Sequence, residues 1–318
     1  EEKYIEQCLD SIIANDYPKE HLEILIYDGG STDNTLKILE EYSKKYSFVV
    51  VKHNPKKIQA TAMNLGIKEV QGDIVIRMDA HTIYEKDYIP QAVKLLNETA
   101  AVNVGGTQAG RGNSYFTNSL IMALSNVFIS GNAIYRSNKN ARQYVDTVYL
   151  GAWHKKDLEA AGGFDESFIV NEDYELNYRL REKGGKILFS PDIKSTYYVR
   201  GSLLKLIRQY FRYGFWKAKT LKKHPASLKI RQMVAPLFIL ALFFSLALTF
   251  CQIYYLLWLL SGCYVIAFVL LSKNSLNIKN IKYMPAIFFI ALFIHLSWGM
   301  GFFAGLSRWC FLNKKYGA

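Results

Sequence analysis

The chain has 318 residues, enough for one large domain or two domains of ordinary size. It carries 39 lysines and arginines against 27 aspartates and glutamates, a formal net charge of +12, but the two signs are unevenly distributed. All the acidic residues lie at or before Asp192, together with 22 of the basic ones, whereas the rest of the chain contains 17 basic residues and no acid. This excludes a uniformly basic nucleic-acid-binding protein and indicates a membrane enzyme with an acidic globular part, a basic segment and an apolar tail.

The first part of the chain alternates between helical and strand patterns. Apolar residues recur at helical spacing from Tyr4 to Ile13, and the run from Leu22 to Tyr27 is typical of a strand. The run from Ile74 to Met78 is too short for a stable helix and β-branched enough to be a buried strand. Further strands are predicted at 48–51, 101–104, 146–153, 186–189 and 196–199, and further helices at 59–70, 87–97, 119–129 and 155–161. The alternation predicts an α/β fold with a mostly parallel sheet covered by helices.

Polar side chains follow two of the predicted strands. Asp28 comes directly after the strand 22–27, and Asp79 and His81 follow the run from Ile74 to Met78. The carboxyl ends of strands are where open α/β sheets bind ligands, and an aspartate and a histidine two residues apart suit a divalent cation with positions open for a diphosphate. The alternatives are a solvated loop carboxylate beside a chance histidine, and an Asp28 that only satisfies loop amides.

A third polar group opens the predicted helix that begins near Asn171. A carboxylate presented by Glu172 or Asp173 at this helix start could face a cleft and take a proton from a hydroxyl. Acidic residues in a first turn are also favoured by the helix dipole whatever their function, so both interpretations stay open.

The basic segment from Ser202 to Lys223 is amphipathic. Its pattern suits a helix at a membrane interface above anionic lipid. Gln209 and Arg212 are three residues apart and therefore adjacent on this helix, where they could contact lipids or a diphosphate. One face of the helix is apolar and consists of Leu203, Leu204, Ile207, Phe211 and Phe215.

The tail contains three long uncharged apolar runs, at 234–250, 253–271 and 285–306. Each is close to the roughly 20 residues that cross a hydrocarbon core of about 30 Å. Lys273, Lys279 and Lys282 fall between the second and third runs. The positive-inside rule places this loop in the cytoplasm, on the same side as the basic segment.

Four ordered segments resemble motifs of the family 2 glycosyltransferases with the GT-A fold. Asp28–Thr35 resembles the first nucleotide-binding loop of that family, and Asp79-Ala80-His81 resembles its DxD metal motif. Gly162–Glu166 with Asn171–Asp173 resembles the GGFDE…ED segment, and Gln209–Tyr213 resembles the QxxRW motif of membrane-bound members. The resemblance extends over essentially the whole chain.

The likeness is greatest to the succinoglycan biosynthesis (ExoA-like) branch of the family. It rests on Met78–His81, Gly131–Arg136, Val145–Gly151 and Gln209–Gly214. This chain departs from the family pattern in three ways. His81 replaces the last aspartate of DxD, Tyr213 replaces the tryptophan of QxxRW, and the first strand is missing or only begun at Glu1.

The resemblance implies a domain organisation and a fold. Residues 1–200 are expected to form a Rossmann-like GT-A glycosyltransferase domain without its first strand. Residues 201–232 are expected to form the basic interface helix, and residues 233–318 a transmembrane region of about three helices.

The resemblance also implies a membrane-bound inverting hexosyl transfer from a nucleotide sugar, with a UDP-sugar as the expected donor, to a lipid-linked acceptor in exopolysaccharide biosynthesis. Asp28 and Asp79 are expected to bind the nucleotide sugar, and Asp79 with His81 a Mg²⁺ or Mn²⁺ ion. Asp173 is the expected catalytic base, and Glu172 is the second candidate for that role.

The expected partners are a polyprenyl-diphosphate-linked sugar, whose diphosphate Gln209 and Arg212 would bind, and membrane lipids, with no nucleic acid. The expected location is the bacterial cytoplasmic membrane, as a multi-pass protein with its catalytic domain in the cytoplasm.

Two other functions compete most closely with this interpretation, and a transporter is a third and weaker one, because the predicted spans contain no acidic residue. One is a processive polysaccharide synthase, for which three spans are few to form a channel. The other is a non-catalytic membrane protein that uses a GT-A domain as a binding module, against which the intact Asp79, Asp173 and Arg212 argue.

Overall fold

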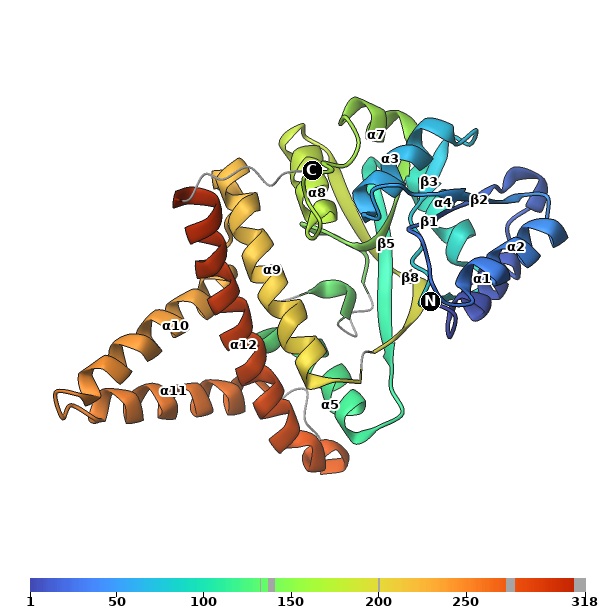
Figure 1. Ribbon diagram of the computed structural model, residues 1–318. Coiled ribbons are helices and arrows are strands. Elements are labelled where there is room, and N and C mark those ends of the chain that lie inside the picture. Colours follow the sequence, from blue (N-terminus) through green and yellow to red (C-terminus); the bar gives the residue numbers. More distant parts are fainter. Residues whose placement is uncertain (132, 137–140, 200, 273–277, 312–318) are drawn as a thin grey trace. The chain divides into compact units, whose positions relative to one another are not determined.

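We describe the protein from a computed structural model, in which residues 1–131, 133–136, 141–199, 201–272 and 278–311 are described (Figure 1). Asn132 and Lys273, which belong to segments singled out in the sequence, lie outside these ranges. The chain forms two compact units, one of residues 1–110 and 134–198 and the other of residues 111–133 and 199–318. Each unit is described by itself.

The first unit alternates between helices and strands. Up to its first break it contains α1 (Ile5–Ile13), the 3₁₀ turn η1 (Lys19–His21), β1 (Ile24–Asp28), α2 (Thr35–Lys45), β2 (Val49–His53), α3 (Gln59–Glu69), β3 (Ile74–Ile76), β4 (Thr82–Tyr84), α4 (Tyr88–Glu98) and β5 (Ala101–Arg111). It continues with η2 (Ile134–Arg136), β6 (Gln143–Tyr144), β7 (Tyr149–His154), α7 (Lys155–Ala160), α8 (Glu172–Glu182) and β8 (Lys186–Tyr198).

The strands form two sheets. β1 and β2 make a parallel pair, and the larger sheet has the order β3-β7-β5-β8-β4, with β6 beside β8. The pairs β3–β7, β5–β7, β4–β8 and β6–β8 are antiparallel. The predicted α/β class is confirmed, but the sheet is mixed and not mostly parallel. The alternation of helices and strands suggested parallel pairing, but the glycine-rich segment before β7 does not determine in which direction that strand runs. The direction of β7 is decided by its pairing with β3 and β5 in the folded structure.

The core of the first unit forms where amphipathic helices meet the larger sheet. In α4 the apolar residues fall on one face at helical spacing, and Leu95 on this face is completely buried. It belongs to one cluster with Val104 of β5 and Ile193 of β8. A separate cluster joins Trp153 of β7 and Leu176 of α8 to residues of α3 and α7. The helix that carries Glu172 and Asp173 is therefore anchored on the sheet by its apolar face.

Most predicted elements are present, but β5 extends to Arg111, the predicted helix 119–129 is divided into α5 and α6, and β6 was not predicted. Two further differences are instructive. β4, at Thr82–Tyr84, was not predicted, and it turns the segment of Asp79 and His81 into a connection between two strands. β8 is one strand of 13 residues where two short strands were predicted. The prediction treated Pro191 and the polar residues near it as a break, but the strand continues through them.

The second unit is helical. It contains α5 (Tyr115–Ser125), α6 (Val127–Ser130), α9 (Leu203–Lys223), η3 (Pro225–Ser227), α10 (Ile230–Thr249), α11 (Tyr255–Ser272), η4 (Ile278–Tyr283), α12 (Met284–Leu306) and a π-helical turn η5 (Ser307–Phe311). Among the residues described, three of its helical segments, 230–249, 255–272 and 280–310, are long and apolar enough to cross a membrane. They correspond to the three apolar runs of the sequence, and the protein is a membrane protein.

The helices α9 and α12 lie side by side in the second unit (Figure 1). Glycines allow the two backbones to approach, since a Cβ at Gly214 would lie 2.0 Å from the Trp298 oxygen and one at Gly301 would lie 2.1 Å from the Phe211 oxygen. The side chains of α9 buried by this packing include Leu206 and Ala218, not the predicted apolar face. Much of that predicted face is exposed, namely Leu203, Leu204 and Phe211.

Candidate active site

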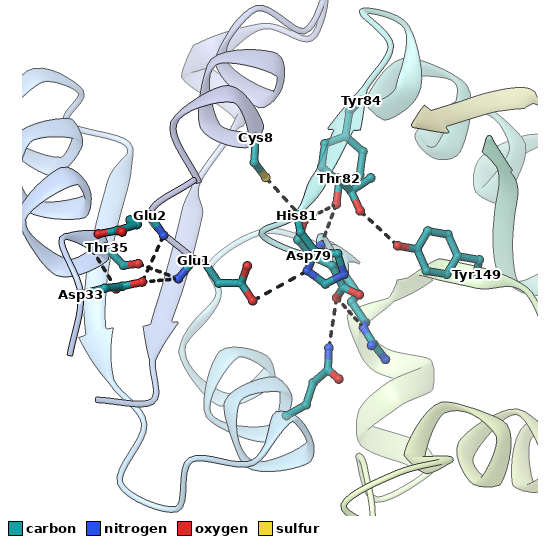
Figure 2. A network of polar contacts seen from close by, with 12 residues as sticks. Glu1, Glu2, Cys8, Asp33, Thr35, Asp79, His81, Thr82, Tyr84 and Tyr149 are labelled. Carbon is teal, nitrogen blue, oxygen red and sulfur yellow. Dashed lines mark hydrogen bonds and ion pairs between the residues drawn. The ribbon is translucent and has the colours of Figure 1, made fainter. Parts of the chain in front are cut away.

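The loop between β3 and β4 holds Asp79 by its backbone. The Asp79 N–H donates to the Tyr84 hydroxyl at 2.7 Å, and the same hydroxyl donates to the Asp79 carbonyl oxygen at 3.2 Å (Figure 2). The Thr82 N–H also donates to that carbonyl at 3.2 Å. These contacts fix the peptide of Asp79 at the end of β3, so its carboxylate has a defined position.

The carboxylate of Asp79 is only partly occupied by protein donors. Oδ1 accepts hydrogen bonds from the Gln59 amide at 3.0 Å and from Arg77 Nε at 3.2 Å, and 16% of the side chain is exposed. Oδ2 has no hydrogen-bond partner within the described ranges. One oxygen is therefore open to a ligand.

His81 lies close to Asp79 in the same loop (Figure 2). Its Nδ1 is 4.0 Å from a carboxylate oxygen of Glu1, and its ring meets Tyr197 edge-on at 5.4 Å between centroids. No group of three or more His, Cys, Asp or Glu side chains gathers as a metal cage in the part of the chain that the structure describes. Asp79 and His81 fit a divalent cation of the kind that takes one or two protein ligands and completes its coordination with substrate phosphates and water.

Arg77 joins this loop to the start of α8. Its Nε contacts Asp79, and its Nη1 lies 3.2 Å from Oε1 of Glu172, which is 95 positions away in the chain. Both side chains of this second pair are largely buried, with 11% of Arg77 and 7% of Glu172 exposed. The structure thus brings two of the predicted acidic segments together around one guanidinium group.

Glu172 and Asp173 have different surroundings. Burial raises the pKa of Glu172 to about 7, the negative charge of Asp173 adds to this rise, and Arg77 opposes it. Asp173 is half-buried, and its Oδ1 accepts a hydrogen bond from the Tyr174 N–H at 2.7 Å. Its Oδ2 has no hydrogen bond among the residues described, so Asp173 is the more accessible of the two carboxylates.

Asp28 organises its own loop. Its carboxylate accepts hydrogen bonds from the Gly30 N–H at 2.8 Å, the Ser31 N–H at 3.0 Å and the Ser31 hydroxyl at 2.6 Å. Burial alone would raise the pKa of Asp28, but these hydrogen bonds outweigh it and lower the pKa. The positive φ of Gly30, 86°, allows the turn. The Asp28 carboxylate is thus directed at the amides of its own loop.

Comparison with known proteins assigns the chain to a family. Residues 1–152 match the profile described as Glycosyl transferase family 2. A dolichyl N-acetyl-alpha-D-glucosaminyl phosphate 3-beta-D-2,3-diacetamido-2,3-dideoxy-beta-D-glucuronosyltransferase of Methanococcus voltae is 32% identical over 97% of this chain and 94% of the relative. The succinoglycan biosynthesis protein ExoA of Rhizobium meliloti (strain 1021) is 30% identical over 96% of this chain and 92% of the relative.

The chain belongs to glycosyltransferase family 2. The protein is an enzyme, a glycosyltransferase, and its predicted relationship to the ExoA branch is confirmed. Among solved structures, the mannosyltransferase PcManGT from Pyrobaculum calidifontis, in complex with GDP-Man and Mn²⁺, has a TM-score of 0.57 at 17% identity. The match covers 99% of this chain and 85% of that chain, and it confirms the predicted GT-A fold.

The GGFDE segment of this glycosyltransferase anchors the loop that leads to α8. Asn64 of α3 accepts a hydrogen bond from the Phe164 N–H at 2.8 Å and donates to the Phe164 carbonyl at 2.9 Å. Glu166 accepts from Lys56 at 2.8 Å, Thr61 at 2.9 Å and Asn64 at 3.0 Å. The hydrogen bonds from Lys56 first, and then from Asn64, lower the pKa of Glu166 to about 2. Arg179 of α8 donates to the Gly163 carbonyl at 2.7 Å, so this segment is tied to the helix that begins with Glu172 and Asp173.

Gln209 and Arg212 lie in α9 of the second unit. The Gln209 amide donates to the hydroxyl of Tyr213 at 2.6 Å, so the residue that replaces the tryptophan of QxxRW binds the glutamine of that motif. Arg212 is exposed and has no hydrogen bond or ion pair with any residue that the structure describes.

Three residues of the site were not predicted from the sequence. Arg77 could have been noticed as the one charged residue in the apolar run from Ile74 to Met78. Gln59 and Tyr84 carry no such signal, because their contacts with Asp79 depend on how α3 and β4 pack.

Proposed function

We propose that this glycosyltransferase transfers one sugar from a nucleotide sugar, with a UDP-sugar as donor, to a lipid-linked acceptor with inversion of the anomeric configuration. The observation that carries the proposal is the contact of Arg77 with both Asp79 and Glu172. It supports a single site in which a diphosphate-binding carboxylate and a proton-accepting carboxylate serve one reaction.

Asp79 and His81 would hold the divalent cation, Mg²⁺ or Mn²⁺, with the diphosphate of the donor. Such an ion supplies positive charge that stabilises the departing nucleoside diphosphate, an effect worth several kcal/mol. The open Oδ2 of Asp79 supports this role. Asp28 would act indirectly, by holding the loop of Gly30 and Ser31 in the conformation that contacts the nucleoside.

Asp173 would be the catalytic base. It takes the proton of the acceptor hydroxyl while the acceptor oxygen bonds to the anomeric carbon, and the bond from that carbon to the diphosphate oxygen breaks on the opposite face. Glu172, buried and held by Arg77, is less suited to meet an acceptor.

A lipid-linked acceptor is supported by the three long apolar helices and by the name of the M. voltae relative, which specifies a dolichyl phosphate-linked sugar. In our proposal the acceptor is a polyprenyl-diphosphate-linked sugar of an exopolysaccharide repeat unit, and Gln209 and Arg212 bind its diphosphate. A planar guanidinium such as that of exposed Arg212 can bind two phosphate oxygens at once. The basic residues of α9 favour a cytoplasmic position for the catalytic unit.

The test is Asp173→Asn in the purified full chain, assayed with a panel of nucleotide sugars and a lipid-linked acceptor, with and without EDTA. We expect nucleotide-sugar binding to persist and transfer to fall about 10²- to 10⁴-fold, the usual effect of losing a general base. The matched control is Asp157→Asn, an aspartate in the first turn of α7, which should transfer normally. Near-normal transfer by the Asp173 variant would exclude the assigned base, and long polymeric products would favour a processive synthase.

A further inference from the structure

Arg136 is oriented by a buried glutamine of the first unit. Its Nε donates to Oε1 of Gln108 at 3.2 Å, and only 8% of Gln108 is exposed. The side chain of Gln108 also hydrogen-bonds the hydroxyl of Tyr149. Because the Gln108 oxygen accepts from arginine, its NH₂ group is the donor to the tyrosine. Gln108 therefore joins Arg136 of η2 to Tyr149 of β7.

Two tyrosine rings lie beside this guanidinium. The guanidinium carbon of Arg136 is 5.4 Å from the centre of the Tyr135 ring, a distance at which an aromatic face attracts a cation. The rings of Tyr135 and Tyr149 are in turn stacked, with centroids 6.0 Å apart and an angle of 24° between their planes. These contacts and the one with Gln108 are all with uncharged groups. They orient the positive charge of Arg136 without neutralising it.

Tyr149 also reaches the Asp79 loop. Its hydroxyl lies 3.1 Å from the hydroxyl of Thr82, and the Thr82 N–H donates to the Asp79 carbonyl (Figure 2). Burial first, and then the negative charge of Asp79, raise the pKa of Tyr149. One glutamine and one tyrosine side chain therefore connect Arg136 to the loop of the candidate active site.

Arg136 and Gln108 also lie next to the points where the chain passes between its two units. The first unit is interrupted after Gly110 and resumes at Ile134, and residues 111–133 belong to the unit with the apolar segments. Gln108 is two residues before the first of these points, and Arg136 is two residues after the second. Two residues of extended chain span at most about 7 Å. Arg136 is therefore within this reach of the unit that enters the membrane.

A phosphate of a lipid-linked acceptor fits this position. Such a molecule keeps its prenyl chain in the membrane, so its phosphate lies at the membrane surface and its sugar extends from there to the reacting groups. The diphosphate of the donor is assigned to Asp79 and His81 with their cation. A guanidinium has five N–H donors in a planar fork, so a contact through Nε is compatible with a second contact to two oxygens of one phosphate.

We propose that the guanidinium fork of Arg136, positioned by Gln108 and Tyr135, binds a phosphate group of the lipid-linked acceptor and so selects acceptors that carry their sugar on a phosphate. The inference rests on the lipid-linked acceptor of the proposed function, and it adds a phosphate contact in the first unit to the one expected of Arg212. It also gives a role to the end of the segment Gly131–Arg136, which was singled out in the sequence.

The test is binding of farnesyl diphosphate, a soluble prenyl diphosphate, to the purified full chain in detergent. Farnesol is the phosphate-free probe, and UDP with Mn²⁺ is the donor-side probe. We expect Arg136→Gln to raise the Kd of farnesyl diphosphate at least about tenfold, the usual effect of losing a hydrogen bond between charged groups, and to leave the other two Kd values unchanged. Arg136→Lys keeps the charge but not the fork, so its Kd should be intermediate. The matched control is Arg142→Gln, an exposed arginine paired with Asp192, which should bind all three probes normally.

Unchanged binding of farnesyl diphosphate by Arg136→Gln, or no binding by the wild-type chain, would overturn the proposal. A loss seen only in Arg212→Gln would also overturn it and would leave the proposed function intact. An equal loss of UDP binding would assign Arg136 to the donor, and an equal loss of farnesol binding would show a general disturbance of the fold; either result overturns the proposal. If Arg136→Gln does not fold, a wild-type Kd for Arg136→Lys overturns it. The transfer assay with Asp173→Asn judges the proposed function separately.

Discussion

From the contact of Arg77 with two acidic segments we predict how much stability the substitution Arg77→Met removes. The substitution keeps an unbranched apolar stem but removes the positive charge from a group of three carboxylates, those of Asp79, Glu172 and Asp173. Because the exposed fractions are only 11% for Arg77, 16% for Asp79 and 7% for Glu172, solvent cannot replace the lost partner effectively. Removing one member of a buried ion pair typically costs about 3–5 kcal/mol. For a unit of this size that corresponds to a fall in Tm of about 10 °C.

The size of this loss depends on pH. In the wild-type protein the pKa of Glu172 is raised from its ordinary 4.5 to about 7, so the folded state keeps a proton that the unfolded chain releases. The contribution of Glu172 to stability therefore falls as pH rises from about 4.5 to about 7 and levels off above that. Without Arg77, whose charge lowers this pKa, the fall continues above pH 7. The destabilisation by Arg77→Met relative to wild type should accordingly be larger at pH 8.5 than at pH 6.

The measurement is thermal unfolding in detergent at both pH values, with Arg142→Met as the matched control. Arg142 also pairs with a carboxylate, that of Asp192, at 2.6 Å, but the two side chains are 49% and 42% exposed. Exposed pairs contribute about 0–1 kcal/mol, so this control should hardly change Tm. If Arg77→Met cost no more than Arg142→Met, or if its effect did not grow with pH, the buried bridge inferred here would be refuted.

Two further predictions concern other parts of the chain. Gly214→Ala should destabilise the helical unit by at least about 1–3 kcal/mol, the usual cost of overpacking, and so lower its Tm, because the new Cβ would lie 2.0 Å from the Trp298 oxygen. Gly262→Ala should be neutral or stabilising by up to about 1 kcal/mol, because a Cβ at Gly262 meets no atom within 4 Å. Equal Tm values for the two variants would contradict the close packing of α9 on α12. Glu166→Gln should lower the free energy of unfolding by about 1 kcal/mol at pH 7, after allowance for solvent screening. The difference in unfolding free energy from wild type should shrink as the pH falls from 4.5 toward 2, because the stability that the lowered pKa of Glu166 contributes is lost over that range. If the difference in unfolding free energy between Glu166→Gln and wild type stays constant from pH 7 to pH 3, the contacts of Lys56 and Asn64 do not depend on the negative charge of Glu166.

The sequence by itself determined the class of the fold, the three apolar segments and the family. These properties follow from local patterns: the helical spacing in α4, the β-branched run of β3, and uncharged stretches long enough to cross a bilayer. The motifs around Asp28, Asp79 and Asp173 were readable for the same reason, because each occupies a few consecutive residues beside a strand or helix end.

Only the tertiary structure decided the direction of β7, the existence of β4 and the meeting of Arg77 with Glu172. These features depend on contacts between residues far apart in the chain, whose geometry no local pattern encodes. The face of α9 that packs was also undetermined, because the close approach to α12 requires Gly214 opposite Trp298.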